Sequence, residues 1–225
     1  MIKAVKAKFA DKYLPLQTSK DKPINPYRVL GDLQNTLDPK NSLVTGDSGS
    51  PRDQSSTVYQ AIIPHGFLGW GNVSTLGFSL AGAVAGKLAF PDRQIVNVTG
   101  DAGVGYMLGN LEAALRNNLG ITTVHLNNSG YAGYGPGFWG AGENPYTWEL
   151  TSSEKCNLAK AVQGIGIYAE RVTEPAEIVP AIKRALDENA KKRPAYIEVI
   201  TSQYPVWGTW VGLNPKGTTR SQVKY

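Results

Sequence analysis

The segment that decides the fold of this 225-residue chain is QIVNVTGDAGVGYMLGNLEAALRNNLGITTVHLNNSG, residues 94–130. Residues 94–99 and 121–126 are mostly apolar runs typical of buried strands. Residues 103–117 lie between them and have the composition of a helix, entered through the glycines of the turn at 100–103. This order predicts two neighbouring parallel strands joined by a crossover helix.

The rest of the chain repeats this alternation. Apolar strands separated by helices predict an α/β fold: a doubly wound, mostly parallel sheet with helices on both faces. Such sheets bind ligands outside the carboxyl ends of their strands, where loops 46–50, 100–103 and 127–133 carry unusual residues. Residues 1–24 are polar and lysine-rich without clear periodicity, so we expect a linker or an arm there. Further strands are expected at 42–45, 168–172 and 195–200, and helices at 27–37, 75–88, 153–162 and 174–191.

Composition excludes several classes of protein. With 41% hydrophobic and 18% charged residues, the chain has the composition of a globular protein. No apolar run approaches the thickness of a bilayer, so no membrane partner is expected. The single cysteine, Cys156, cannot form an internal disulfide and fits a cytoplasmic location. The net charge of +5 is dispersed, and its densest cluster, residues 191–193, sits at an expected helix end, so nucleic-acid binding is not expected.

Asp101 points to a divalent cation. The glycines around it would let the backbone approach an anion such as a phosphate at the start of the helix. A carboxylate in that place would repel the phosphate unless a cation lay between them. Hard cations such as Mg²⁺ prefer oxygen ligands, and the next strand ends in Asn127-Asn128-Ser129-Gly130, which offers amide and carbonyl oxygens. A helix cap is the simpler interpretation of Asp101, but it leaves the asparagines unexplained.

The segment from Asp101 to Gly130 resembles the thiamine-diphosphate motif, which runs from Gly-Asp-Gly to paired asparagines and a metal-binding carbonyl. Asn128 follows Asp101 by 27 positions (128 − 101), a spacing typical of the branch with decarboxylases and acetolactate synthases. The sequence also resembles 2-hydroxyacyl-CoA lyases, over roughly residues 24–204. Ala102 departs from the usual glycine. The resemblance implies that Asp101, the Asn128 side chain and the Gly130 carbonyl bind Mg²⁺.

The resemblance also implies a thiamine-diphosphate site. Residues 45–50 resemble the first diphosphate-contacting loop, and residues 74–78 resemble the turn beneath the bend of the cofactor. There the Ser74 carbonyl would accept a hydrogen bond from the aminopyrimidine, and Leu76 would hold that ring over the thiazolium. The implied cofactor-binding residues are Ser48, Gly49, Ser50, Ser74, Thr75, Leu76, Gly100, Ala102, Gly103, Asn128, Gly130, Tyr131 and Ala132.

Complete subunits of the resembled family carry an amino-terminal pyrimidine-binding domain and a middle domain before the diphosphate-binding domain. We therefore expect a linker or arm at residues 1–24, a diphosphate-binding domain at 25–203 and a tail or lid at 204–225. No glutamate here matches the motif of the activating glutamate of the missing domain. This predicts the small subunit of a split enzyme, inactive alone, in a hetero-oligomer (two of each subunit or more) with a larger partner that supplies that glutamate.

Thiamine chemistry predicts a small-molecule substrate whose C–C bond is cleaved beside a carbonyl. The leading hypothesis is a lyase or carboligase component that acts on 2-oxoacids or 2-hydroxyacyl-CoA. The alternative is a subunit of a thiamine-dependent 2-oxoacid decarboxylase or oxidoreductase, although one cysteine argues against an iron–sulfur cluster in this chain. A non-catalytic regulatory or cofactor-storage homologue is the third possibility.

Several residues allow two interpretations. His65 lies, by resemblance, in a loop near the cofactor, where it is either catalytic or structural. His125 is expected to be a hydrogen-bonded core histidine, and Cys156 an inert helix residue. The aromatic loop 131–148 either lines the substrate entrance or forms an interface, and the tail 204–225 is either a lid or an arm that covers a partner.

Overall fold

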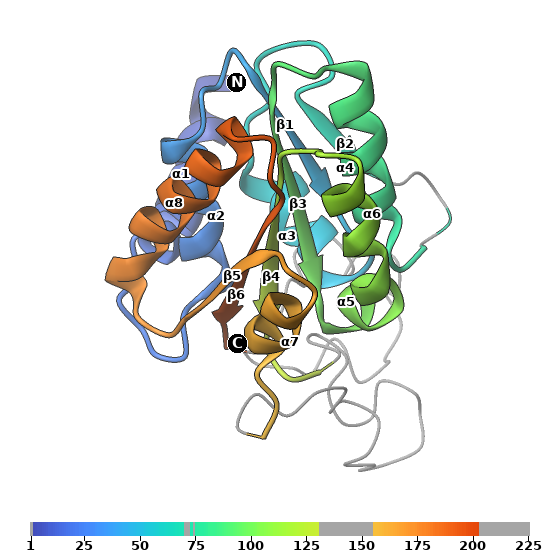
Figure 1. Ribbon diagram of the computed structural model, residues 1–225. Coiled ribbons are helices and arrows are strands. Elements are labelled where there is room, and N and C mark those ends of the chain that lie inside the picture. The colour runs from blue at the N-terminus through green and yellow to red at the C-terminus, as the bar shows by residue number, and fades with distance from the viewer. Residues whose placement is uncertain (1, 70–72, 74, 131–154, 203–225) are drawn as a thin grey trace.

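The computed structural model describes residues 2–69, 73, 75–130 and 155–202, which form a three-layer α/β structure (Figure 1). Its centre is a six-stranded, all-parallel sheet with the order β2-β1-β3-β4-β6-β5. The predicted doubly wound parallel fold is therefore confirmed. The strands are β1 (Ser42–Gly46), β2 (Phe67–Gly69), β3 (Gln94–Gly100), β4 (Ile121–Asn127), β5 (Tyr168–Val172) and β6 (Ala195–Ile200).

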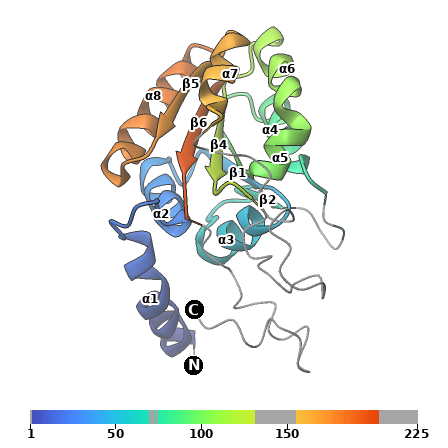
Figure 2. The same cartoon turned by 90° about the horizontal axis from the view of Figure 1, so that it is seen from below.

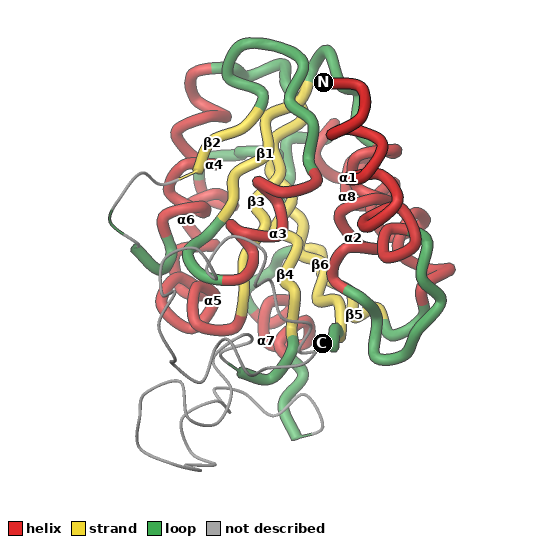
Figure 3. Tube along the Cα trace, turned by 180° about the vertical axis from the view of Figure 1, so that it is seen from behind, coloured by secondary structure: helices red, strands yellow, loops and turns green. Residues whose placement is uncertain are grey.

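Helices cover both faces of the sheet because strand residues alternate between the faces and both sets are largely apolar. One core joins Val44, Val96 and Val124 to α2 (Pro26–Thr36), α3 (Ser50–Val58) and α8 (Ile178–Ala190). The other core joins Leu43, Ile95 and Ile121 to the opposite helices (Figures 1 and 3). These are α4 (Phe78–Ala89), α5 (Asp101–Met107), α6 (Leu111–Arg116) and α7 (Leu158–Gly164), with 3₁₀ turns at η1 (Leu108–Asn110) and η3 (Pro175–Glu177).

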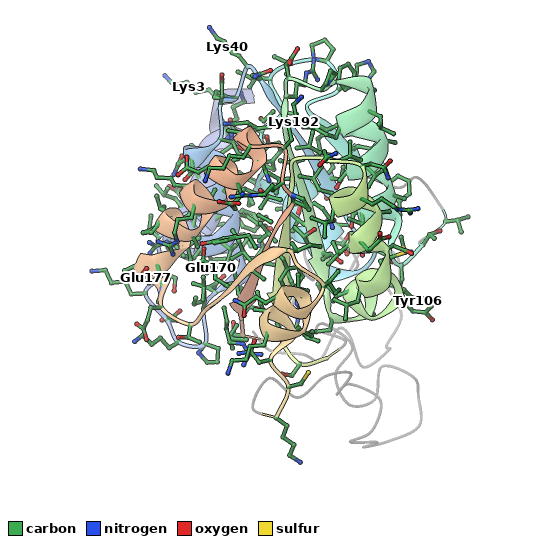
Figure 4. The ribbon with its side chains drawn as sticks, viewed as in Figure 1. Lys3, Lys40, Tyr106, Glu170, Glu177 and Lys192 are labelled. Carbon is green, nitrogen blue, oxygen red and sulfur yellow. The ribbon has the colours of Figure 1, made fainter. Side chains whose placement is uncertain are left out.

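The parallel strands all end at the same edge of the sheet, at the bottom of Figure 1. The loops that follow β1, β3 and β4 therefore share this edge, as the sequence predicts. Lys40 and Lys192 lie at the opposite end (Figure 4). The cationic cluster at 191–193 sits at the end of α8, where Lys191 and Arg193 both pair with Glu188. That cluster is thus remote from the loops where a ligand is expected.

Residues 2–17 form a helix, α1 (Ile2–Gln17), which the sequence analysis did not predict. Most of α1 is exposed, including Val5 and Leu14, and only Tyr13 and Leu16 near its carboxyl end pack against the core. Figure 2 shows α1 beside α2, with its amino end farthest from the sheet. A helix that contacts its domain only at one end needs no continuous apolar stripe, which explains the missing periodicity.

Helix α3 and strand β2 were not predicted from the sequence, and some predicted boundaries differ from the observed ones. The buried side of α3 includes Asp53, Gln54 and Ser55, so its sequence lacks an apolar pattern. The helix expected at 103–117 is divided into α5 and α6 by η1, and α7 begins at Leu158 rather than near 153. Cys156 is consequently an exposed residue before α7 and not a helix residue.

None of the helices among the described residues is both long enough and apolar enough to cross a membrane.

Candidate functional site

Asp101 is the centre of the candidate site. It is the first residue of α5, directly after β3, and its side chain is fully buried. One carboxylate oxygen, Oδ2, accepts hydrogen bonds from the backbone amides of Asn128 (3.2 Å) and Gly130 (3.1 Å). The other oxygen, Oδ1, lies 3.1 Å from Nε2 of His125. The three residues predicted to bind a cation are therefore brought together by direct contacts.

The turn after β4 is fixed by its own side chains. Oδ1 of Asn127 accepts a hydrogen bond from the amide of Ser129 (3.0 Å), and Oδ1 of Asn128 accepts one from the amide of Gly130 (3.0 Å). Such side-chain-to-backbone bonds are typical of asparagine in tight turns. Ser129 adopts a positive φ of 63°, which keeps the turn short enough to wrap around the Asp101 carboxylate.

A buried carboxylate anchors this turn to the sheet. Glu198 of β6 accepts hydrogen bonds from Nδ2 of Asn127 (2.8 Å), from the amide of Ala159 (3.0 Å) and from the guanidinium of Arg171 (2.8 and 2.9 Å). Burial alone would raise the pKa of Glu198, but these donors, Arg171 foremost, lower it below its ordinary value. The turn is thereby tied to β5, β6 and the start of α7.

Asp47 joins the loop after β1 to the end of β3 and to the turn before α4. Its buried carboxylate accepts hydrogen bonds from the amides of Ser48 (2.8 Å) and Gly77 (3.0 Å) and from the Thr99 hydroxyl (2.8 Å). Burial raises the pKa of Asp47, and the hydrogen bonds offset part of this effect. Asp47 lies in the loop 45–50 that is expected to contact the diphosphate, but no separate role was predicted for its carboxylate. Its position directly after a buried strand, like that of Asp101, was the available signal.

The predicted cofactor-binding residues of the described chain gather around Asp47 and Asp101. Ser48 is buried, and Gly49, with a φ of 83°, precedes α3, which begins at Ser50. Gly103 faces Asp47 so closely that an added Cβ would lie 1.8 Å from Oδ2 of that residue. The other members at this edge are Thr75 and Leu76 before Gly77, Gly100 at the end of β3, and Ala102 in the first turn of α5.

Some predictions fall outside the described residues. These are Ser74, Tyr131 and Ala132 of the cofactor set, the aromatic loop from 131 to 148, and the tail from 204 to 225.

His65 lies away from this site, which corrects its expected position near the cofactor. It precedes β2 at the amino ends of the strands, and its ring stacks on Phe90 at a centroid distance of 5.7 Å. The carbonyls of Pro64 and His65 accept hydrogen bonds from Arg93, which precedes β3. Asp101 follows the carboxyl end of β3, so the geometry favours the structural role of His65 over the catalytic one.

A small cavity lies between α5 and the sheet, and apolar side chains such as Leu80, Val104 and Leu111 form much of its wall. Its lining includes Asn97, Thr99, Thr123 and Tyr196 from the sheet and Gly103 from α5. Oδ1 of Asn97 is buried and has no hydrogen-bond partner within the described part of the chain. Buried amide oxygens of this kind are normally satisfied by ordered water.

The donor set at this edge suits a hard cation. The described residues contain no cluster of three or more His, Cys, Asp or Glu side chains that could hold a metal ion. A cation here would therefore need amide and carbonyl oxygens in addition to one carboxylate. Asp101, Asn128 and Gly130 offer that combination, which Mg²⁺ and Ca²⁺ accept.

Comparison with known proteins gives a family match over this region. The model of the family "Thiamine pyrophosphate enzyme, C-terminal TPP binding domain" matches residues 47–199. The acetolactate synthase large subunit of Mycobacterium tuberculosis is 29% identical over 185 residues, which cover 80% of this chain and 32% of that protein. The isozyme 3 large subunit of Escherichia coli acetolactate synthase is 26% identical over 178 residues, 78% of this chain and 30% of that protein.

A third relative has a different name. The 3D-(3,5/4)-trihydroxycyclohexane-1,2-dione hydrolase of Lacticaseibacillus casei is 27% identical over 165 residues, which cover 72% of this chain and 25% of that protein. The chain thus spans about a third or less of the length of these curated relatives.

Proposed function

The chain belongs to the family of C-terminal domains that bind thiamine pyrophosphate in thiamine pyrophosphate enzymes, and from this premise we propose its function. It is the diphosphate- and Mg²⁺-binding component of a thiamine-diphosphate-dependent C–C lyase or carboligase that acts on 2-oxoacids or 2-hydroxyacyl-CoA. The observation that supports this most directly is the Asp101 carboxylate, enclosed by the turn that carries Asn128 and Gly130.

The proposal gives each loop at the carboxyl edge a task. Asp101, the side-chain oxygen of Asn128 and the carbonyl of Gly130 would hold Mg²⁺. The loop from Ser48 to Ser50 and the backbone at 100–103 would contact the diphosphate. When bound, the cofactor supplies the electron sink for cleavage of a C–C bond beside a carbonyl. The protein orients that group and neutralises the charge of its diphosphate.

The buried polar groups beside the site would hold these loops in place before the cofactor binds. Asp47 links the loop after β1 to the end of β3 and to the start of α4, and Glu198 anchors the turn after β4. A preformed site loses less conformational entropy on binding than a flexible one. Leu76, half-buried beside Gly77, would support the bend of the cofactor.

The activating glutamate is proposed to come from a partner. Two of the compared relatives are named acetolactate synthase large subunits, and this chain spans about a third of their length. We therefore place the pyrimidine-binding half on a larger subunit, in a hetero-oligomer of two copies of each or more in the cytoplasm. The names favour a carboligase, while the hydrolase among the relatives leaves the substrate open. A 2-oxoacid decarboxylase or oxidoreductase component remains the alternative.

Calorimetric titration with thiamine diphosphate tests the cofactor part of this proposal. Binding to the chain, alone or with its partner, should require Mg²⁺ and disappear in EDTA. The D101N variant, which removes the carboxylate charge at nearly constant volume, should bind more than about 100-fold more weakly, beyond the range typical of residues that only support a ligand. D187N is the matched control, because Asp187 is exposed on α8. Metal-independent binding, or equal affinity of D101N and D187N, would refute the proposed metal site.

A further inference from the structure

We infer that His125 is a positioning residue for the proposed metal site, because it holds the Asp101 carboxylate in a fixed orientation. The inference rests on the proposed function, since Asp101 is taken to bind the cation. The sequence predicted only a core histidine with its hydrogen bonds satisfied. The structure confirms that His125 is buried and hydrogen-bonded, and adds that one of its partners is Asp101.

His125 connects three elements. It lies near the end of β4, and its Nε2 is 3.1 Å from Oδ1 of Asp101 at the start of α5. Its Nδ1 is 2.7 Å from the hydroxyl of Tyr196 on the neighbouring strand β6. All three side chains are buried, and the imidazole has a polar partner at both nitrogens. This chain of contacts runs from β6 through β4 to the carboxylate.

The contacts decide which nitrogen of a neutral imidazole carries the proton. A carboxylate only accepts hydrogen bonds, so Nε2 must donate to Asp101. Nδ1 then accepts a hydrogen bond from the Tyr196 hydroxyl. Burial raises the pKa of Tyr196 well above its ordinary value, so the phenol keeps the proton that it donates. Tyr196 thus selects the form of His125 that points a donor at Asp101.

The carboxylate of Glu198, the other charged group beside His125, already accepts hydrogen bonds from other residues. Glu198 lies opposite His125 in the register of β4 and β6, but its carboxylate accepts hydrogen bonds from Arg171, Asn127 and the Ala159 amide. His125 therefore faces Asp101 as its acidic hydrogen-bond partner.

The effect on Asp101 is restraint at both oxygens. Oδ2 accepts hydrogen bonds from the amides of Asn128 and Gly130 in the turn after β4, and Oδ1 accepts one from His125 within β4. Rotation of the carboxylate about its Cβ–Cγ bond would disturb these contacts together. Removal of residues that orient a metal ligand typically weakens metal binding by about 10- to 100-fold. His125 should make a contribution of that size without touching the metal.

Two isosteric variants separate this role from simple packing. The amide nitrogen of glutamine lies as many bonds from Cβ as the Nε2 of histidine, so H125Q can still donate to Asp101. The amide nitrogen of asparagine instead matches Nδ1, so H125N can reach Tyr196 but not Asp101. Y196F removes the hydroxyl that selects the tautomer and leaves the imidazole in place.

The experiment is a Mn²⁺ titration of each variant by electron paramagnetic resonance at saturating thiamine diphosphate, with unfolding measured separately in EDTA. We expect H125N to lose about 10- to 100-fold in Mn²⁺ affinity, Y196F to lose less, and H125Q to stay within a few-fold of the wild type. If His125 served packing alone, the variants with the lowest stability to unfolding in EDTA would also have the lowest Mn²⁺ affinity. Whether a variant can still donate a hydrogen bond to Asp101 would then make no difference.

The outcomes separate the role of His125 from the metal site itself. Wild-type affinity in H125N would overturn the role of His125 and leave the metal site intact. If H125N does not fold, the test rests on H125Q, which keeps a donor toward Asp101. A loss of Mn²⁺ affinity in H125Q as large as that in D101N would also overturn the role of His125. If the wild-type protein binds no Mn²⁺ with the cofactor, the proposed function fails and this inference fails with it.

Discussion

At the scale of single residues, two buried carboxylates on the same face of the sheet have pKa values shifted in opposite directions. Asp47 accepts hydrogen bonds from neutral donors, namely backbone amides and the Thr99 hydroxyl, so burial prevails and raises its pKa. Glu198 is buried too, but it pairs with the Arg171 guanidinium, and its pKa is lowered. The sign of each shift therefore depends on whether a cation faces the carboxylate.

These shifts predict opposite pH dependences of stability. As the pH rises above 3.8, an unfolded Asp47 loses its proton while the folded one keeps it, so the wild-type protein loses stability relative to D47N. The relative loss should approach about 1.4 kcal/mol for each pH unit until the folded carboxyl also ionises. Urea unfolding of both proteins from pH 4 to pH 7 in EDTA measures this difference. A constant difference across that range would contradict the prediction.

The E198Q variant is expected to show the opposite pH dependence of folding stability. As the pH falls below 4.5, an unfolded Glu198 takes up a proton while the folded one stays ionised, so the wild-type protein loses the stability that the ion pair contributes. The advantage of the wild type over E198Q should therefore be complete above that pH and shrink below it. If D47N and E198Q show the same pH trend, the assigned causes of these shifts are wrong.

At the scale of elements, the start of α5 is packed so tightly that only glycine fits at 103. A Cβ at Gly103 would lie 1.8 Å from Oδ2 of Asp47 and 2.4 Å from Oγ1 of Thr99. Gly105, in the same helix, is exposed, and a Cβ added there would meet nothing within 4 Å among the described residues. Helix propensity favours alanine equally at both positions, so packing is the difference between them.

This contrast predicts that identical substitutions have opposite effects. G103A should destabilise the protein by about 1–3 kcal/mol, because Asp47 and Thr99 must move. G105A should stabilise it by about 0.5–1 kcal/mol through helix propensity. Chemical denaturation of both variants against the wild type decides the matter. A stabilised G103A would show that the loops around Asp47 rearrange freely.

The elements that the sequence predicted are those with continuous apolar patterns. β6 was predicted with the observed bounds because it is a buried, mostly apolar run. β5 was also predicted with the observed bounds, although only Ala169 and Val172 of its five residues are buried. α3 was missed because Asp53 and Gln54, which have the polarity of surface residues, are buried in it. α1 was missed because it lies mostly outside the core. In both cases tertiary surroundings, which local patterns do not record, determine the exposure of the helix.

At the scale of the whole molecule, sequence reasoning predicted which loops meet but not how they are connected. The rule that parallel strands end at one edge predicted that Asp101 and Asn128 lie together. It could not predict that His125 would reach Asp101, or that Asp47 would bond Thr99, which lies 52 positions away. Those contacts depend on side-chain directions across several strands, and they are the contacts that set the charge and rigidity of the candidate site.

At the scale of the whole molecule it can also be tested whether this chain needs a partner subunit to complete its active site. If the activating glutamate lies on a partner subunit, the purified chain should bind thiamine diphosphate and Mg²⁺ yet show no carboligase or decarboxylase turnover with 2-oxoacids. Addition of the co-purified larger subunit should restore turnover, and substitution of that subunit's glutamate by glutamine should abolish it without preventing assembly. D101N in this chain should abolish turnover in the same complex, with D187N as the control. Full turnover by the chain alone would refute the split-enzyme proposal, because no second protein surface would then be needed.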